Sequence, residues 1–347
     1  MWSSQGWEVS GRATAADPSR WSAIGVEGWP AGRLSGRFRY RVDSRDRNHG
    51  RLSAWLSESA WAGWRADSGT VAVDFPRGAA DSFVVHAFRR GGSITLGAAA
   101  HGGAWGGNYT LARFPLDEWP DGRASGLKGT LESGSGTVRG EAGALAVTGT
   151  LSGVSTTWFG VRTARWKLEH VTGRLLPVPD LTADARLGDV LFLGVHFDST
   201  TTPFHLGDQS LDLPSVKAWA GDTVVTVAGR STWSERGWTF AADSAAATSS
   251  QFRWIAAPPL ALDGDRTGVT FERVVATDDT ARLEISGRWA SPGGTYAWKG
   301  RATGLDVGRL GLPHPWGLAG RADAELRVDG PSGDPRWSFV GTVVGPG

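Results

Sequence analysis

Apolar and polar residues alternate with a period of two along several segments of this chain. Successive residues of a β-strand point to opposite faces of a sheet, so the pattern predicts strands with one apolar and one polar face. The alternation is clearest at 36–43, 69–75, 163–170, 281–290 and 320–329. The apolar positions are Phe38, Tyr40, Val42, Val71, Val73, Phe75, Trp166, Leu168, Leu283, Ile285, Trp289, Ala324, Leu326 and Val328. The charged positions between them include Arg37, Arg39, Arg41, Arg282, Glu284, Arg288, Arg321, Asp323 and Glu325.

Clusters of turn-forming residues separate these segments, and helical periodicity is nearly missing. The sequence predicts a hairpin that turns at Asp278 and Asp279, and further turns at "SGSG" (133–136) and "DGPSGDP" (329–335). The Ala-rich "AADSAAATSS" (241–250) favours a loop because of its Ser, Thr and Asp content. The predicted fold class is therefore all-β.

Three phrases of the chain resemble one another, near 6–45, 109–132 and 295–345. Each carries a Gly-containing strand beside a Trp/Pro segment. Their uneven spacing is atypical of a propeller or a leucine-rich repeat. We expect an elongated, curled antiparallel β-sheet built from irregular repeats, with residues 1–347 forming one repetitive segment and no separate globular domain.

A single-layer sheet cannot leave a large apolar face in water. The face must close on itself, pack on another sheet, or curl into a trough that holds something apolar. In the third case the apolar positions given above line the trough, and the charged positions keep the outside soluble.

The composition of the chain argues against nucleic-acid binding and against sites that need cysteine. The chain has 347 residues, 50 of them Gly and 19 Trp, and its net charge of +1 predicts no nucleic-acid partner. Cysteine is absent, which excludes disulfides, thiolate zinc sites and Cys nucleophiles. No apolar run reaches 18 residues, and the N-terminal segment does not resemble a secretion signal. Because the last strand runs to the C-terminus, we interpret the chain as an internal fragment of a longer protein.

Local motifs for chemistry are weak. His196, Asp198, His205 and Asp208 have ligand-type side chains, but their spacing matches no metal motif, and the Thr-rich stretch between them favours a loop. "SGSGTVRG" continues as a strand, so it lacks the helix that a phosphate loop needs. The tryptophans could stack on sugars, although their recurrence near hairpins favours structural packing. We expect no catalytic residue, no metal site and no cofactor, and hence a protein that is not an enzyme.

The C-terminal phrase resembles the repeats of the TamB/AsmA-like family. Leu318, Gly320, Leu326, Val328 and Gly330, followed by a proline at 335, match the recurrent phrase of that family. The phrases around Gly36 and Gly126 match it more loosely.

The resemblance implies a bridge-like lipid transport protein of the periplasm in a diderm bacterium. Such proteins are anchored in the inner membrane by a helix that is absent here, and their curled sheet is thought to carry phospholipid acyl chains toward the outer membrane. One branch is linked to outer-membrane biogenesis through a barrel assembly partner, by way of parts outside this chain. On this interpretation the apolar positions line the lipid groove, and the partners are phospholipid acyl chains.

Two alternatives stay open from the residues. An outer-membrane β-barrel also alternates apolar and polar positions, but it favours even strands and Tyr-rich girdles, and this chain has 3 Tyr. A secreted β-rich adhesin or carbohydrate-binding protein would use the tryptophans, although a short regular coil period is absent.

Overall fold

The computed structural model describes residues 6–17, 32–43, 49–61, 64–76, 80–101, 104–118, 127–141, 144–158, 161–176, 178–234, 236–265, 267–290, 294–306 and 320–345. Parts of the three repeat phrases, at 18–31, 119–126 and 307–319, lie outside the described residues. The chain divides into two compact units. Unit 1 comprises 1–158 and 165–183, and unit 2 comprises 159–164 and 184–347.

The described residues confirm the predicted all-β class. They form 22 strands of one antiparallel sheet, with a single 3-10 turn, η2 (Leu116–Glu118). None of them forms a helix of the length and hydrophobicity needed to cross a membrane.

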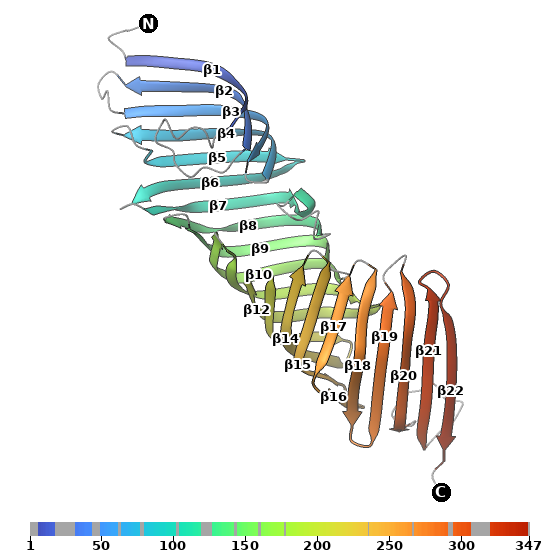
Figure 1. Cartoon of the computed structure of the whole chain (residues 1–347). Coiled ribbons are helices and arrows are strands. Elements are labelled where there is room, and N and C mark those ends of the chain that lie inside the picture. The colour runs from blue at the N-terminus through green and yellow to red at the C-terminus, as the bar shows by residue number, and fades with distance from the viewer. Residues whose placement is uncertain are drawn as a thin grey trace. The chain divides into compact units, whose positions relative to one another are not determined.

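In unit 1 each strand pairs with the next along the chain, from β1 to β9, as Figure 1 shows for the ribbons from blue to green. Their bounds are β1 (Gly6–Ala16), β2 (Gly32–Asp43), β3 (His49–Trp61), β4 (Trp64–Pro76), β5 (Ser82–Arg89), β6 (Gly92–His101), β7 (Ala104–Pro115), β8 (Lys128–Glu141) and β9 (Ala144–Trp158). β10 (Val161–Leu176), which pairs with β9, and β11 (Asp180–Phe192) contribute residues to both units.

Unit 2 continues the meander from β12 to β22. Its strands are β12 (Val195–Gly207), β13 (Ser210–Ala220), β14 (Thr223–Ser234), β15 (Gly237–Thr248), β16 (Arg253–Ala256), β17 (Leu260–Asp265), β18 (Gly268–Asp278), β19 (Ala281–Ala290), β20 (Thr295–Asp306), β21 (Arg321–Pro331) and β22 (Arg336–Val344). The short strands β16 and β17 lie end to end between β15 and β18, because both pair with each of these neighbours.

Local sequence predictions had mixed outcomes. The hairpin at Asp278 and Asp279 is confirmed, since Asp278 pairs with Ala281 across the turn. The predicted turn at "SGSG" is wrong, because these residues lie in the middle of β8. The predicted loops at 241–250 and in the Thr-rich stretch after His196 are wrong as well, because most of the first lies in β15 and the second lies in β12. In the first two cases pairing with both neighbouring strands outweighs the weak strand preference of Gly, Ala and Ser, whereas the Thr residues of the third stretch themselves favour a strand.

Glycines inside strands make room for large side chains on the neighbouring strand. A Cβ atom on Gly153 of β9 would stand 2.4 Å from Cζ2 of Trp166, and one on Gly134 of β8 would stand 2.6 Å from Cδ2 of Leu151. This packing across strands explains why the SGSG segment is strand rather than turn.

The best-buried cluster of unit 1 lies around η2. Phe114, Leu116 and Leu131 are nearly inaccessible, and Leu111 and Trp166 pack against them. Among the described side chains, Leu131 and Val328 are the large ones that are fully buried. Most other apolar side chains keep part of their surface exposed, so the sheet has little conventional core.

Candidate functional site

One face of strands β1–β9 is apolar from strand to strand. Residues that pair directly across adjacent strands point to the same face, so the register groups side chains into rows. The first row consists of Gly11, Phe38, Ala54, Val71, Val85, Leu96 and Tyr109. The second consists of Val9, Tyr40, Leu52, Val73, Phe83 and Ala98. Val42 and Phe75 share a third row with Gly50. Six of the positions selected from the sequence therefore lie on this face.

Trp166 and Leu168 belong to β10. The Trp166 ring covers Gly153 and packs against Leu131, and its indole Nε1 donates a hydrogen bond of 2.7 Å to Oγ1 of Thr156. Gly153 pairs with Leu131 and lies two residues from Leu151, which faces Gly134. Trp166 thus belongs to the apolar face of unit 1, and Leu168, two residues further along β10, points to the same side.

Unit 2 has an apolar face of the same kind. One row consists of Val216, Val227, Ala245, Ala256, Ala276, Leu283, Ala302 and Ala324. A parallel row consists of Phe240, Leu262, Phe271, Gly287, Trp298, Val328 and Trp337. Ile285 faces Gly300, which faces Leu326, and Trp289 faces Val269. The six remaining sequence-selected residues therefore share one face of unit 2.

Aromatic rings gather at one end of this face. Trp289 stacks on Trp298 with ring centroids 5.7 Å apart, and it meets Tyr296 edge-on at 5.4 Å. The turn after β11 approaches the same ring, because a Cβ atom on Gly194 would stand 3.5 Å from Cζ2 of Trp289. The apolar face of unit 2 is thus the side toward which the β11–β12 turn lies.

Most members of the apolar rows are half-buried, and a smaller set is buried, namely Val42, Ala98, Val269, Phe271, Ala276, Ala302 and Val328. Apart from η2, every described element is a strand of the sheet, and the β11–β12 turn lies over part of the apolar face of unit 2. Val9 is 48 % exposed, Trp337 60 % and Phe339 70 %. These three side chains lie on β1 and β22, the first and last strands of the meander, and other exposed apolar side chains, such as Val84 and Ile255, lie on the opposite face.

The opposite face is polar and rich in ion pairs. Arg273 bonds both carboxylate oxygens of Glu284 at 2.9 and 3.1 Å, and Arg51 bonds Asp74 at 2.6 Å. These arginine hydrogen bonds lower the pKa of Glu284 and of Asp74. The charged positions selected from the sequence fall on this face, for example Glu284 opposite Arg301 and Glu325 opposite Arg301.

The three tyrosines of the chain, Tyr40, Tyr109 and Tyr296, all belong to the apolar faces. Tyr40 and Tyr109 lie in the rows of unit 1, and Tyr296 packs against Trp289. Burial raises the pKa of Tyr109, because the neutral phenol is favoured where water is excluded.

The histidine and aspartate residues selected as metal-type ligands are spread along one hairpin. His196 lies 3.9 Å from Asp189 and 4.0 Å from Asp198, whereas His205 lies 3.4 Å from Asp212. No group of three His, Cys, Asp or Glu side chains that could hold a metal ion occurs within the described ranges.

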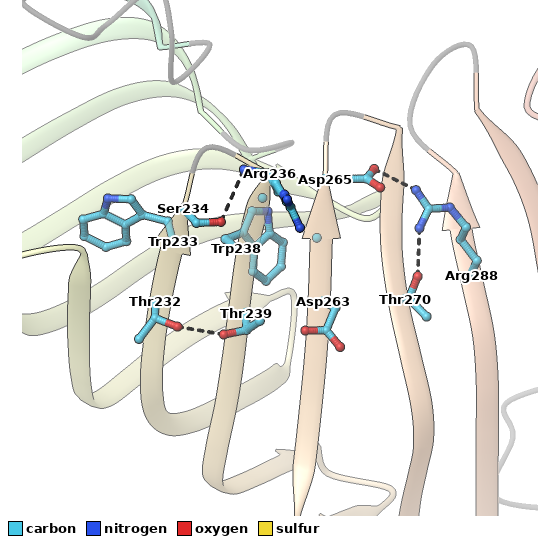
Figure 2. Close-up of a pocket in the computed structure, with 12 residues that line it drawn as sticks. Thr232, Trp233, Ser234, Arg236, Trp238, Thr239, Asp263, Asp265, Thr270 and Arg288 are labelled. Carbon is cyan, nitrogen blue, oxygen red and sulfur yellow. Dashed lines mark hydrogen bonds and ion pairs between the residues drawn. The ribbon is translucent and has the colours of Figure 1, made fainter.

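A small depression of about 360 Å³ lies where β14 and β17 end and β15 and β18 begin (Figure 2). Its polar side chains largely bond one another. Thr232 and Thr239 share a hydrogen bond of 2.8 Å, and Arg288 donates to Asp265 at 2.7 Å and to Thr270 at 2.8 Å. The depression is therefore a less favourable binding site than the long apolar rows.

Sequence reasoning missed many members of the rows. Leu52, Ala54, Val85, Leu96 and Tyr109 complete the face in unit 1, yet none of them was selected. Their strands carry Ala, Gly, Ser or Thr on both faces, which blurs the alternation. The register that aligns them is a property of strand pairing and cannot be read from one segment alone.

Comparisons with models of protein families, with curated proteins and with solved structures found no match to this chain.

Proposed function

We propose that the apolar face of each unit binds the acyl chains of phospholipids, as part of a bridge-like protein that carries lipids across the periplasm of a diderm bacterium. The observation that carries this proposal is the uninterrupted apolar row. In unit 2 the row from Val216 to Ala324 crosses eight strands, which at about 4.8 Å between strands amounts to roughly 34 Å. The acyl chains of one leaflet fill only about 15 Å.

The chemistry of the rows suits an acyl chain. Hydrophobic burial is non-directional and scales with area, at about 25 cal/mol per Å², so it needs a continuous surface and no specific polar contact. The rows offer Val, Leu, Ala and aromatic rings without a charged side chain. A chain can bind anywhere along such a surface and can shift along it in small steps.

The accessible surface is larger than that of two compact domains. The chain exposes 21285 Å². Two compact domains, each of half its mass, would expose only about 16,000 Å² together. An excess of this kind is expected of an open sheet that exposes both of its faces.

The resemblance of the C-terminal phrase to TamB/AsmA-like repeats supports the lipid as the ligand and an inner-membrane-anchored bridge as the setting. A role in outer-membrane biogenesis, through a barrel assembly partner bound elsewhere, belongs to the same proposal. Binding along a surface requires no catalytic group, so the proposed activity is transport rather than catalysis.

The test is native mass spectrometry of the purified chain, with lipid extraction in parallel. We expect phospholipids to co-purify, and to be lost from a double variant Leu283→Asp and Leu326→Asp, whose charges enter adjacent rows. The matched control is Ser286→Asp with Ser338→Asp, which adds the same charge on the polar face opposite Lys299 and Arg327.

Circular dichroism confirms that each variant remains folded before lipids are compared. Lipid-free wild-type protein, or equal lipid retention by both double variants, contradicts the proposal.

A further inference from the structure

The polar face of β1–β3 collects five arginines within three adjacent strands. Arg12 of β1 pairs directly with Arg37 of β2, and Arg41 of β2 pairs with Arg51 of β3. Arg39 lies between Arg37 and Arg41 on the same face. We call these five residues, together with Trp55, the arginine patch. Trp55 pairs with Arg37 and is 49 % exposed.

The acids near the patch neutralise only two of the arginines. Glu8 binds Arg39 at 3.2 Å, and Asp74 binds Arg51 at 2.6 Å. Arg12, Arg37 and Arg41 are exposed and form no ion pair within the described part of the chain, although Glu8, which bonds Arg39, lies directly opposite Arg41 in the register. The patch therefore carries an uncompensated positive charge.

The polar face of unit 2 also places two cations opposite each other, Lys299 and Arg327, but its arginines are more often paired with acids. There Arg273 binds Glu284 at 2.9 Å, Arg301 binds Glu325 at 3.5 Å and Arg327 binds Asp329 at 2.6 Å. Exposed arginines in this fold can thus be matched with acids across or along the strands. The arginine patch departs from that arrangement.

Like charges placed directly opposite one another on an antiparallel pair destabilise the pairing. An anion that contacts both guanidinium groups turns this repulsion into attraction, and guanidinium groups suit phosphate oxygens because they can bind them in a bidentate way. The patch measures about 10 Å across the strands and about 13 Å along them. Its cations are spread over an area rather than focused on one point.

We propose that the arginine patch docks the chain onto an anionic lipid bilayer. A bilayer presents a flat array of phosphates, which matches cations spread on the face of a sheet. Trp55 supplies the amphipathic ring that settles at the level of the headgroups. Trp7 and Val9, on the other face of β1, are 39 % and 48 % exposed, so apolar side chains lie at the same end of the sheet. This proposal does not rest on acyl-chain binding, because the patch lies on the opposite face from the apolar rows.

The experiment is flotation of the full chain with two kinds of vesicle, one of equimolar phosphatidylglycerol and phosphatidylcholine and the other of phosphatidylcholine alone. We expect binding to the anionic vesicles only. Raising the salt from about 0.1 M to 1 M, which shortens the Debye length from about 10 to 3 Å, should release the chain.

The triple variant Arg12→Gln, Arg37→Gln, Arg41→Gln should bind anionic vesicles roughly 100-fold more weakly. The corresponding Arg→Lys triple variant keeps the charge and should bind within a few-fold of wild type, which separates loss of charge from loss of fold. The matched control, Arg273→Gln, Arg301→Gln, Arg327→Gln, removes the same charge from unit 2 and should bind like wild type.

Three results overturn the proposal. They are equal binding to both kinds of vesicle, an equal loss of binding by the control triple variant, and binding of duplex DNA as tight as that of anionic vesicles. The last result would assign the patch to nucleic acid instead.

Discussion

Trp166 of β10 packs over Gly153 of β9, and substitutions at these two positions test how the two strands are aligned. A Cβ atom on Gly153 would stand 2.4 Å from Cζ2 of Trp166 and 2.6 Å from the backbone oxygen of Thr130. The ring can swing away, but the backbone oxygen cannot. Gly153→Ala should therefore destabilise the fold by about 1–3 kcal/mol, the usual cost of overpacking.

Removing the Trp166 ring should change the stability cost of Gly153→Ala. Trp166→Ala should cost about 2–3 kcal/mol, below the 3–5 kcal/mol of a fully buried tryptophan, because the side chain is only partly buried. In that background Gly153→Ala still meets the oxygen of Thr130 but no longer meets the ring, so its cost should fall by roughly 1 kcal/mol.

The assay is urea unfolding of the two single variants and the double variant, followed by circular dichroism, with midpoints compared at constant slope. Gly106→Ala is the control, since a Cβ atom there has nothing within 4 Å, and it should change stability by less than about 0.5 kcal/mol. A neutral Gly153→Ala, or strictly additive single variants, would refute the packing described here.

Three further predictions concern ionisable side chains. The Glu118 side chain is 3 % exposed and binds Arg89 at 3.0 Å, so Glu118→Ala should lower the free energy of unfolding in urea by about 3 kcal/mol. Glu284 is exposed, so Glu284→Ala should lower it by less than about 1 kcal/mol. Similar losses for the two variants would contradict this prediction. The lowered pKa of Asp74 contributes stability that is present above about pH 4 and is lost as the pH falls through the pKa of the folded state. In the Asp74→Asn variant the free energy of unfolding should therefore decrease less steeply with falling pH than in wild type. An unchanged pH dependence would contradict this prediction. Because the pKa of Tyr109 is raised, a tyrosinate absorbance titration should show a late phase that the Tyr109→Phe variant lacks. Bound phospholipid should move that phase to higher pH, because it removes more water from the phenol. A phase whose pH does not change with lipid would contradict coverage of this face.

Alternation of side chains was enough to predict the strand class and the two faces. Phe38, Tyr40 and Val42 on one side of β2, with arginines on the other, correspond directly to the observed strand. The hairpin at Asp278 and Asp279 was equally readable, because Asp is favoured in tight turns and strong alternation follows it.

Glycine and alanine limited the rest of the prediction. Gly134 and Gly136 read as a turn, yet they lie within β8 because Leu151 packs over Gly134 and no room for a side chain exists above Gly136. The same small residues hide the alternation that would have identified Ala54 as a row member.

Register was the other obstacle, since it depends on pairing between residues far apart in the sequence. Arg12 and Arg37 are 25 positions apart along the chain, yet they pair directly. A net charge of +1 averages over the chain and conceals this local excess of cations. Features of the surface that arise from pairing are therefore visible only once the strands are aligned.

Site-specific photocrosslinking tests the central claim most directly. A photoreactive amino acid is placed at Ala54 or Leu283 on the apolar faces, and at Ser53 or Arg282, their neighbours on the polar faces. The chain is then irradiated after expression or after incubation with phospholipid vesicles, and adducts are identified by mass spectrometry. Phospholipid adducts at Ala54 and Leu283 but not at their neighbours are the result that we predict. Adducts of equal yield on both faces, or none on the apolar faces of a folded chain, would contradict an acyl-chain binding surface.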